Sequence, residues 1–293
     1  MTTLIIGATG KQGGATAQAL LAADQPIRVL VRDSEAPKAR ALAARGAELV
    51  RGDLDDHASL VAAASGMTSV FSIPYPDLAN LAGDAELTRA RNLVSAAELA
   101  GVSQFVHTSV AGAGDFSHPG WQEKGRWDRH YWDSKTAIEE IVRSAGFASW
   151  TVLKPATFME NLLEGSFLFG DWRNNGFVTA YAAQTEIPWI AVDDIGAAAA
   201  AAIIDSERFN GQSIDLVGEL LTMTQSAAII SDVLGREVPA PVLNYDEARA
   251  RGLHPAVIST QDYQNVRSNP TPPNLGFPLT TFKAWALQHL RQA

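Results

Sequence analysis

The feature that most constrains this chain is a glycine-rich turn near its beginning, Gly7-Ala8-Thr9-Gly10-Lys11-Gln12-Gly13. The apolar run Thr3–Ile6 precedes this turn and predicts a buried strand, and the residues that follow predict a helix. Gly7 suits the dihedral angles of a sharp turn, and Gly13 lets the helix pack closely on the strand. Gly10 lacks a Cβ, so a pyrophosphate can approach the backbone near the helix N-terminus. The turn therefore predicts a dinucleotide site.

Composition supports a large globular fold and excludes several kinds of site. The chain has 293 residues, of which 46% are hydrophobic, and no linker divides it. It contains no cysteine, which excludes disulfides, thiolate ligands and cysteine nucleophiles, and its histidines lack metal-ligand spacing, so we predict no metal. A formal charge of −9 disfavours binding to nucleic acid or to an anionic membrane. Without a signal-peptide core or an apolar stretch of about 18 residues, we expect a soluble cytoplasmic protein.

Apolar strands alternate with helices along the first half of the chain. The expected strands are Thr3–Ile6, Ile27–Val31, Glu48–Arg51, Ser69–Ile73, Phe105–Ser109 and Trp150–Lys154. Helices are expected between them, at Ala15–Ala22, Ala36–Arg45, Ala58–Ala64, Leu87–Ala100 and around Lys135. This order predicts an α/β fold of the Rossmann type, a doubly wound parallel sheet with helices on both faces.

Beyond Pro155 the pattern loosens into turns, aromatic residues and short helices. The alternation of strand and helix resumes at the apolar run Ile187–Val192 and at a helix that contains the six alanines Ala197–Ala202. We therefore expect a Rossmann domain and a smaller, discontinuous C-terminal lobe on the substrate side, which would close over the carboxyl ends of the strands. The expected bounds are residues 1–154 plus about 187–205 for the dinucleotide-binding Rossmann domain, and about 155–186 plus 206–293 for the lobe.

The residues after the second strand favour NADP(H) over NAD(H). NAD-binding sheets usually carry an acidic residue there, which binds the ribose 2′-hydroxyl. Here Arg32 follows Gly13 by 19 residues, and Lys38 and Arg40 are near it in the sequence. A guanidinium matches a 2′-phosphate in charge and in bidentate geometry. The adjacent Asp33 leaves open the alternative that these are ordinary solvated charges.

Three carboxylates follow the third expected strand. Asp53 stands where it could accept a hydrogen bond from the adenine amino group. Asp55 or Asp56 could instead cap the next helix.

The candidate catalytic residues are Tyr131 and Lys135, a Tyr-x-x-x-Lys pair that shares one helix face. A nearby ammonium favours the phenolate form of tyrosine, so Tyr131 could exchange a proton with a carbonyl oxygen as hydride moves to or from carbon. Lys135 could also bind the nicotinamide ribose. Thr108 and Ser109 end the preceding strand, where a hydroxyl could polarise the substrate carbonyl. We favour Ser109, although the strand parity leaves the choice open.

Six aromatic residues lie in segments that could reach the strand ends: Tyr75, Trp121, Trp127, Trp132, Phe158 and Trp172. They favour an apolar or aromatic substrate, with the equal alternative that they belong to the core. We expect His107 to be a core histidine, and His130 is a candidate second proton donor.

Several short stretches occur in an order that resembles the NmrA-like family of atypical short-chain dehydrogenase/reductases, over nearly the whole chain. They are Gly7–Gly14, Val29–Asp33, Gly52–Asp56, Leu153–Asn161, Ala191–Gly196 and Leu221–Met223. The segment Ile73-Pro74-Tyr75-Pro76 departs from the small-residue turn that usually follows the fourth strand. The resemblance implies NADP(H) binding, with Asp53 near the adenine and Lys135 near the nicotinamide ribose. The implied cofactor-binding residues are Gly7, Thr9, Gly10, Lys11, Gln12, Gly13, Arg32, Lys38, Asp53, Leu54, Ile73, Lys135, Pro155 and Phe158.

The resembled family contains reductases of quinones, dyes and aromatic compounds, and regulators that sense a dinucleotide without the catalytic tyrosine. Because this chain has Tyr131 with Lys135, we expect an NADPH-dependent oxidoreductase of a small apolar or aromatic acceptor, such as a quinone, a carbonyl or a related conjugated compound. The alternative is a non-enzymatic NADP(H)-sensing regulator that acts through a protein partner. An isomerase or epimerase that retains its dinucleotide ranks third, and a homodimer stays open.

Overall fold

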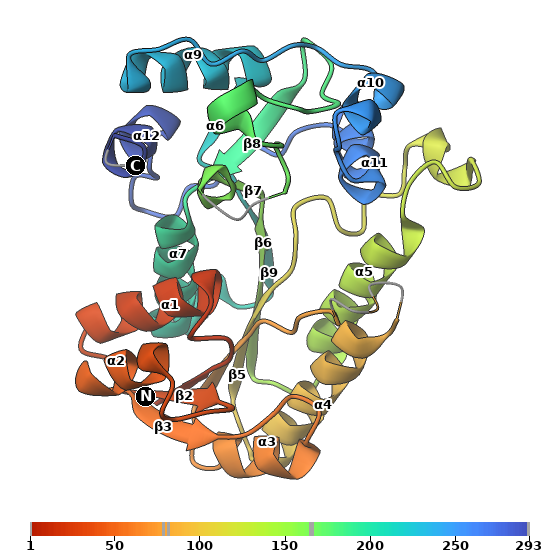
Figure 1. The fold of residues 1–293 in the computed structure, drawn as a ribbon. Helices are drawn as coiled ribbons and strands as arrows, with labels where there is room; N and C mark the ends of the chain where they lie inside the picture. The colour runs from red at the N-terminus through yellow and green to blue at the C-terminus, as the bar shows by residue number, and fades with distance from the viewer. Residues whose placement is uncertain (1, 78–79, 81–82, 164–166, 292–293) are drawn as a thin grey trace. The chain divides into compact units, whose positions relative to one another are not determined.

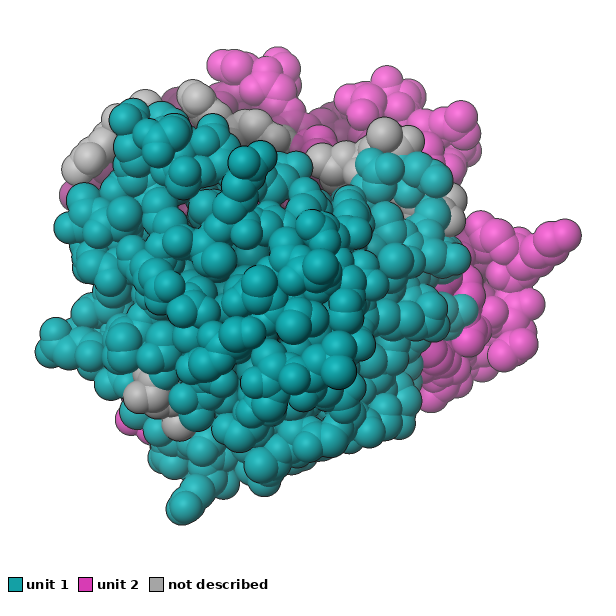
Figure 2. All heavy atoms as spheres, turned by 90° about the horizontal axis from the view of Figure 1, so that it is seen from below, with its two compact units in different colours: residues 1–114, 130–154, 192–214 teal, residues 115–129, 155–191, 215–293 magenta. Residues whose placement is uncertain are grey.

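The computed structural model describes residues 2–77, 80, 83–163 and 167–291. Contacts between residues divide the chain into two compact units, coloured teal and magenta in Figure 2. The first unit comprises residues 1–114, 130–154 and 192–214, and the second comprises residues 115–129, 155–191 and 215–293. The chain therefore passes between the two units several times.

A seven-stranded sheet in the order β3-β2-β1-β4-β5-β6-β9 forms the centre of the first unit (Figure 1). Its strands are β1 Thr3–Ile5, β2 Ile27–Val31, β3 Glu48–Arg51, β4 Ser69–Ser72, β5 Gln104–Thr108, β6 Ser149–Pro155 and β9 Gln212–Leu216. The pairing is parallel from β3 to β6, and Ile5 pairs with Val29 on one side and with Phe71 on the other. The predicted Rossmann-type α/β fold is confirmed.

Helices cover both faces of this sheet (Figure 1). They are α1 Lys11–Ala22, α2 Pro37–Ala44, α3 His57–Ala64, α4 Ala85–Leu99, α5 Arg129–Ser144, α7 Val192–Ile204 and α8 Ser206–Phe209. The Gln104 side chain donates a hydrogen bond to the Ala202 carbonyl in α7 over 2.8 Å. The next residue, Phe105, stacks on Phe147 after α5, with ring centroids 4.7 Å apart. Alternate residues of β5 thus face different helix layers.

Small residues let α7 approach α1. A Cβ on Gly196 would lie only 2.5 Å from the carbonyl carbon of Ala15, closer than two such atoms can come. Most of the predicted alanine run of α7 is buried, which places short side chains where the two helices meet. This packing fixes α1, the helix that follows the glycine turn.

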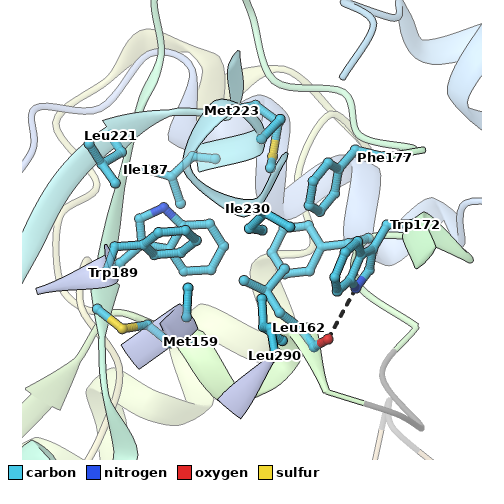
Figure 3. Close-up of a cluster of buried hydrophobic side chains, with 14 of the residues drawn as sticks. Met159, Leu162, Trp172, Phe177, Ile187, Trp189, Leu221, Met223, Ile230 and Leu290 are labelled. Atoms are coloured by element: carbon cyan, nitrogen blue, oxygen red, sulfur yellow. Dashed lines mark hydrogen bonds between the residues drawn. The ribbon is translucent and has the colours of Figure 1, made fainter. Parts of the chain in front are cut away.

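The second unit contains a three-stranded sheet in the order β10-β8-β7. Its strands are β7 Thr157–Phe158, β8 Glu186–Ile190 and β10 Glu219–Thr222, and its helices are α6 Trp172–Asn175, α9 Met223–Leu234, α10 Tyr245–Ala250, α11 Pro255–Gln264 and α12 Phe282–His289, with 3-10 turns at Pro119–Gln122 and Met159–Leu162. Its apolar core surrounds Trp172 and Trp189 (Figure 3). Among the described residues, no helix combines the length and apolar character needed to cross a membrane.

Two strands pair differently from the arrangement expected from the sequence. The run Ile187–Val192 was expected in the Rossmann domain, but β8 pairs with β7 and β10 in the second unit. Conversely, β9 is the seventh strand of the main sheet, although it lies within the expected lobe. An apolar run predicts a strand but does not identify the strand that pairs with it. Because β9 begins with exposed residues, its sequence is also typical of a loop. The functional roles of the two parts stay a prediction.

Candidate functional site

The turn after β1 has the geometry expected for phosphate binding. Gly7 has a φ of +67°, in the left-handed region that favours glycine. A Cβ on Gly13 would lie 2.4 Å from the carbonyl carbon of Gly7, so even a methyl group would push α1 away from the turn. Gly10 is the N-cap of α1, and the first turn of this helix carries no acidic residue. A helix start of this kind suits an anion such as a pyrophosphate.

A cavity of about 500 Å³ lies beside this turn, at the carboxyl ends of β1 to β4. Its lining residues are Ile6, Gly7, Thr9, Leu30, Val31, Arg32, Asp33, Ala36, Pro37, Lys38, Gly52, Asp53, Leu54 and Tyr75. The predicted cofactor residues among them are Gly7, Thr9, Arg32, Lys38, Asp53 and Leu54. Ligands of open α/β sheets bind where the strand order reverses, here between β1 and β4. The cavity, its two cations and the glycine turn together fit the adenosine phosphate half of a dinucleotide.

Hydrogen bonds orient the charged residues around this cavity. Asp33 Oδ1 accepts a hydrogen bond from the backbone N–H of Glu35 over 2.8 Å, so its carboxylate engages its own loop. Lys38 Nζ donates to the Thr9 carbonyl over 3.2 Å, which places an ammonium beside the glycine turn. Arg32 is exposed on the cavity wall. Arg32 and Lys38 therefore line the cavity as two cations, while the carboxylate of Asp33, the residue after Arg32, accepts a backbone N–H of its own loop.

The three carboxylates in the loop after β3 make different hydrogen bonds. Asp53 lines the cavity, and its Oδ1 accepts the backbone N–H of Asp55 over 3.0 Å. Asp56 is the N-cap of α3 and accepts the backbone N–H of Ser59 over 3.2 Å. The Asp55 carboxylate instead accepts two hydrogen bonds from Arg89, of 3.0 and 2.7 Å, which lower its pKa.

The remaining predicted cofactor residues lie outside the lining of this cavity. Gly10, Lys11 and Gln12 form the end of the turn and the start of α1. Ile73 follows β4 and lies against the turn, since a Cβ on Gly7 would come within 2.9 Å of its Cγ2. Pro155 ends β6 and Phe158 ends β7, both in the second unit. Their contacts with a cofactor stay predictions.

The Tyr131 and Lys135 side chains lie together on α5, as their spacing predicts. Lys135 Nζ is 5.6 Å from the centroid of the Tyr131 ring, and Tyr131 is 36% exposed. Lys135 Nζ also donates to Oε1 of Glu86 on α4, over 2.5 Å. The side chains of this pair are only 14% and 6% exposed. Burial opposes the charge of Lys135, but Tyr131 and Glu86 outweigh it and raise the lysine pKa.

The Ser109 hydroxyl is engaged by a second buried carboxylate. It donates to Oε1 of Glu139, two turns after Tyr131 on α5, over 2.6 Å. Arg143 Nη2 donates to the other oxygen of Glu139 over 2.7 Å, and Lys154 Nζ lies 3.6 Å from Oε1. Since serine has one hydroxyl hydrogen, Ser109 would have to turn away from Glu139 to donate to a substrate.

Strand alternation separates Thr108 from Ser109. Thr108 faces the α7 side with Gln104, and its buried hydroxyl has no hydrogen-bond partner among the described residues. His107 and Ser109 face the side of α4 and α5. His107 Nδ1 lies 3.2 Å from Ser72 Oγ, and burial, aided by the charge of Lys135, lowers the histidine pKa to about 3. His107 is therefore a neutral core residue.

Four of the six aromatic candidates are buried in the structure. They are Trp121, Trp127, Trp132 and Trp172. Within the second unit, the first two pack on each other and on Tyr263, and Trp172 stacks on Phe177 in the core shown in Figure 3. Tyr75, at 39% exposed, lines the cavity in the first unit. His130 Nε2 lies 3.2 Å from the Gly83 carbonyl, and its catalytic role stays a prediction.

A sequence model of the NmrA-like family matches residues 1–250. The chain belongs to the NmrA-like family. A related NAD(P)H azoreductase from Xenophilus azovorans is 29% identical over 98% of this chain and 97% of its own length. An NmrA-like family domain-containing oxidoreductase from Aspergillus flavus is 29% identical over 80% of this chain and 73% of its own. Both are named as oxidoreductases or reductases, the class that the sequence predicts here.

A solved structure of similar fold agrees with this architecture. The triphenylmethane reductase of Citrobacter sp., which has also been solved with NADP(H), has a TM-score of 0.79 at 22% identity, with full coverage of both chains. These matches confirm the predicted fold, and the sequence model over residues 1–250 confirms the predicted family.

Proposed function

We propose that this NmrA-like protein is an NADPH-dependent reductase of a small apolar or aromatic acceptor. The observation that carries the proposal is the cavity beside the glycine turn, with Arg32 and Lys38 on its wall and Asp33 engaged by its own loop. Two cations match a ribose 2′-phosphate, which favours NADP(H) over NAD(H). The family relatives named as reductases support the reaction class. The acceptor in this proposal is a quinone, an azo or related dye, or a conjugated carbonyl compound.

Two residues on α5 would carry out the proton transfer of this reaction. When bound, the nicotinamide cofactor would supply hydride to the acceptor. Tyr131 is partly exposed, and its hydroxyl would donate a proton to the acceptor oxygen or nitrogen. Lys135 would stabilise the phenolate that remains, because its ammonium lies 5.6 Å from the ring centroid. An ammonium has three hydrogens, so the bond to Glu86 leaves others for a ribose hydroxyl.

The assay is oxidation of NADPH, and in parallel of NADH, with a panel of quinones, azo dyes, triphenylmethane dyes and ketones. We expect turnover with NADPH in preference to NADH. Tyr131→Phe should lower kcat by about 100-fold or more, the usual contribution of a general acid. Tyr245→Phe is the matched control, since Tyr245 is an exposed tyrosine on α10 in the second unit.

Two outcomes would contradict the proposal in different ways. Full activity of Tyr131→Phe would remove the tyrosine from the mechanism while leaving the reductase in place. Tight NADPH binding without turnover of any acceptor would instead favour the alternative of a dinucleotide-sensing regulator. Capture of a protein partner in one cofactor state alone would strengthen that alternative.

A further inference from the structure

Tyr75 lines the cavity beside the glycine turn, and the proposed proton transfer gives this residue no role. It stands between two prolines, in the segment Ile73-Pro74-Tyr75-Pro76 that follows β4. The ring of Pro74 fixes the φ angle of that residue, and Pro76 disfavours the helical conformation for Tyr75, the residue before it. The backbone that presents this ring is therefore restrained before any ligand arrives.

Arg89 on α4 supports the Tyr75 ring from one side. Its guanidinium carbon lies 4.6 Å from the ring centroid, within cation–π distance. Arg89 Nη1 also donates to the Tyr75 carbonyl over 3.0 Å. A single arginine thus holds both the ring and the backbone of Tyr75.

The same arginine connects Tyr75 to the loop after β3. Arg89 Nε and Nη2 donate to the two carboxylate oxygens of Asp55, over 3.0 and 2.7 Å. Asp55 donates its backbone N–H to Asp53, which also lines the cavity. The Arg89 side chain is only 14% exposed, whereas the Asp55 side chain is 56% exposed, so this ion pair lies at the protein surface. Tyr75 and Asp53 are therefore connected, through Arg89 and Asp55, along one wall of the cavity.

We infer that Tyr75 is the stacking surface for the adenine base of the dinucleotide, with Arg89 and Asp55 as its positioning residues. This inference rests on the proposed dinucleotide binding. Every nucleobase presents a π-face to an aromatic ring, whereas a ribose or a phosphate does not. Asp53, which also lines the cavity, would accept the adenine amino group. In this arrangement Tyr75 contributes affinity for the base, and Arg32 and Lys38 recognise the ribose phosphate.

The test measures binding by calorimetry, separately from turnover, with 2′,5′-ADP for the adenosine half and nicotinamide mononucleotide for the other half. Tyr75→Ala should weaken 2′,5′-ADP and NADPH by about tenfold or more, the usual effect of losing one stacked base. It should leave nicotinamide mononucleotide binding and the KM of the acceptor unchanged. Tyr75→Phe should bind as the wild type does, because the ring is retained.

Two further variants separate stacking from general damage. Arg89→Gln removes the cation and the bidentate bond to Asp55, so we expect a smaller loss of 2′,5′-ADP affinity than for Tyr75→Ala. Tyr245→Ala, which removes an exposed tyrosine from α10, should leave every affinity unchanged.

Each contrary result identifies what has failed. Unchanged 2′,5′-ADP affinity in Tyr75→Ala, with a raised KM for the acceptor, would overturn the inference and place the ring in the acceptor pocket. A wild-type protein that binds neither 2′,5′-ADP nor NADPH would overturn the inference together with the proposed function. A wild-type protein that binds both without reducing any acceptor would overturn the reductase alone, and the Tyr75→Ala result would still decide the inference.

Discussion

The two ends of the candidate site in the first unit depend on different physical features. The nucleotide end, which we define as the turn Gly7–Gly13 and the cavity beside it, depends on backbone shape and on exposed cations. The proposed proton-transfer end, defined as Tyr131 and Lys135 with Glu86 and Glu139, depends on buried charges, since Lys135 pairs with Glu86 and Glu139 pairs with Arg143. The first end should therefore fail when its shape changes, and the second when its charge balance changes.

Replacing Gly13 by alanine tests whether shape controls the nucleotide end, and we expect the largest effect there. The new Cβ would lie 2.4 Å from Gly7 backbone atoms, so α1 must shift away from β1. Crowding against a backbone that cannot yield should cost about 3 kcal/mol of unfolding free energy or more. We expect NADPH binding to disappear at the same time. Urea unfolding and calorimetry measure the two effects.

Gly146→Ala is the matched control for that variant. A Cβ on Gly146 would lie 3.6 Å from Glu98 Oε1, an ordinary contact, and this glycine has no positive φ. Its stability and NADPH affinity should match the wild type. Wild-type affinity in Gly13→Ala would show that the turn does not shape the nucleotide end.

Replacing Glu86 by glutamine tests whether charge controls the proton-transfer end. Removal of one member of a buried ion pair leaves the other charge without compensation, although glutamine can still accept a hydrogen bond. We expect a loss of about 2 kcal/mol in unfolding free energy, less than for a substitution that also removes the hydrogen bond. Because Glu86 raises the Lys135 pKa, the activity of Glu86→Gln should also decline at a lower pH than that of the wild type.

A double-mutant cycle of Glu86→Gln with Lys135→Met isolates the pair from other effects of either change. Two independent effects that simply add would contradict a functional ion pair. Glu140→Gln, on the same helix as Lys135, is the control, because the Glu140 side chain is 72% exposed and should contribute less than about 0.5 kcal/mol.

The contrast between the two ends also explains what the sequence could predict. The glycine turn is local, so its residues alone predict both the strand-to-helix turn and the place proposed for a phosphate. The Tyr131 and Lys135 pair is local as well, since both residues share one helix. Glu86, by contrast, is 49 residues from Lys135 in the chain, and their contact depends on how α4 packs beside α5.

Long-range packing was equally decisive for residues that the sequence did name. A Trp-rich composition cannot distinguish a pocket wall from a core, and Trp121 and Trp172 are buried. Glu139 was not among the predicted site residues, although its position one turn after Lys135, on the same helix face, was visible in the sequence. Its partner Ser109 lies 30 residues before it, so the bond between them appears only in the structure.

His107 gives the smallest and most specific test of the buried charge balance. Its pKa is about 3 in the folded protein, because of burial and the charge of Lys135, whereas the ordinary value is 6.5. Between these values the unfolded chain binds a proton that the folded protein does not, so falling pH favours unfolding. From about pH 6.5 to about pH 5.5 this group alone should lower the unfolding free energy by about 1 kcal/mol.

His107→Asn removes this titration and keeps a hydrogen-bonding group toward Ser72. Its unfolding free energy should therefore fall less between about pH 6.5 and 5.5 than that of the wild type, by about 1 kcal/mol. His254→Asn, at an exposed helix start, is the comparison variant for replacement of a histidine outside the core. The range avoids the titration of Asp55, whose lowered pKa affects stability only below about pH 4. Identical pH slopes in wild type and His107→Asn would mean that His107 is solvated, and that the charge of Lys135 reaches less far than the structure indicates.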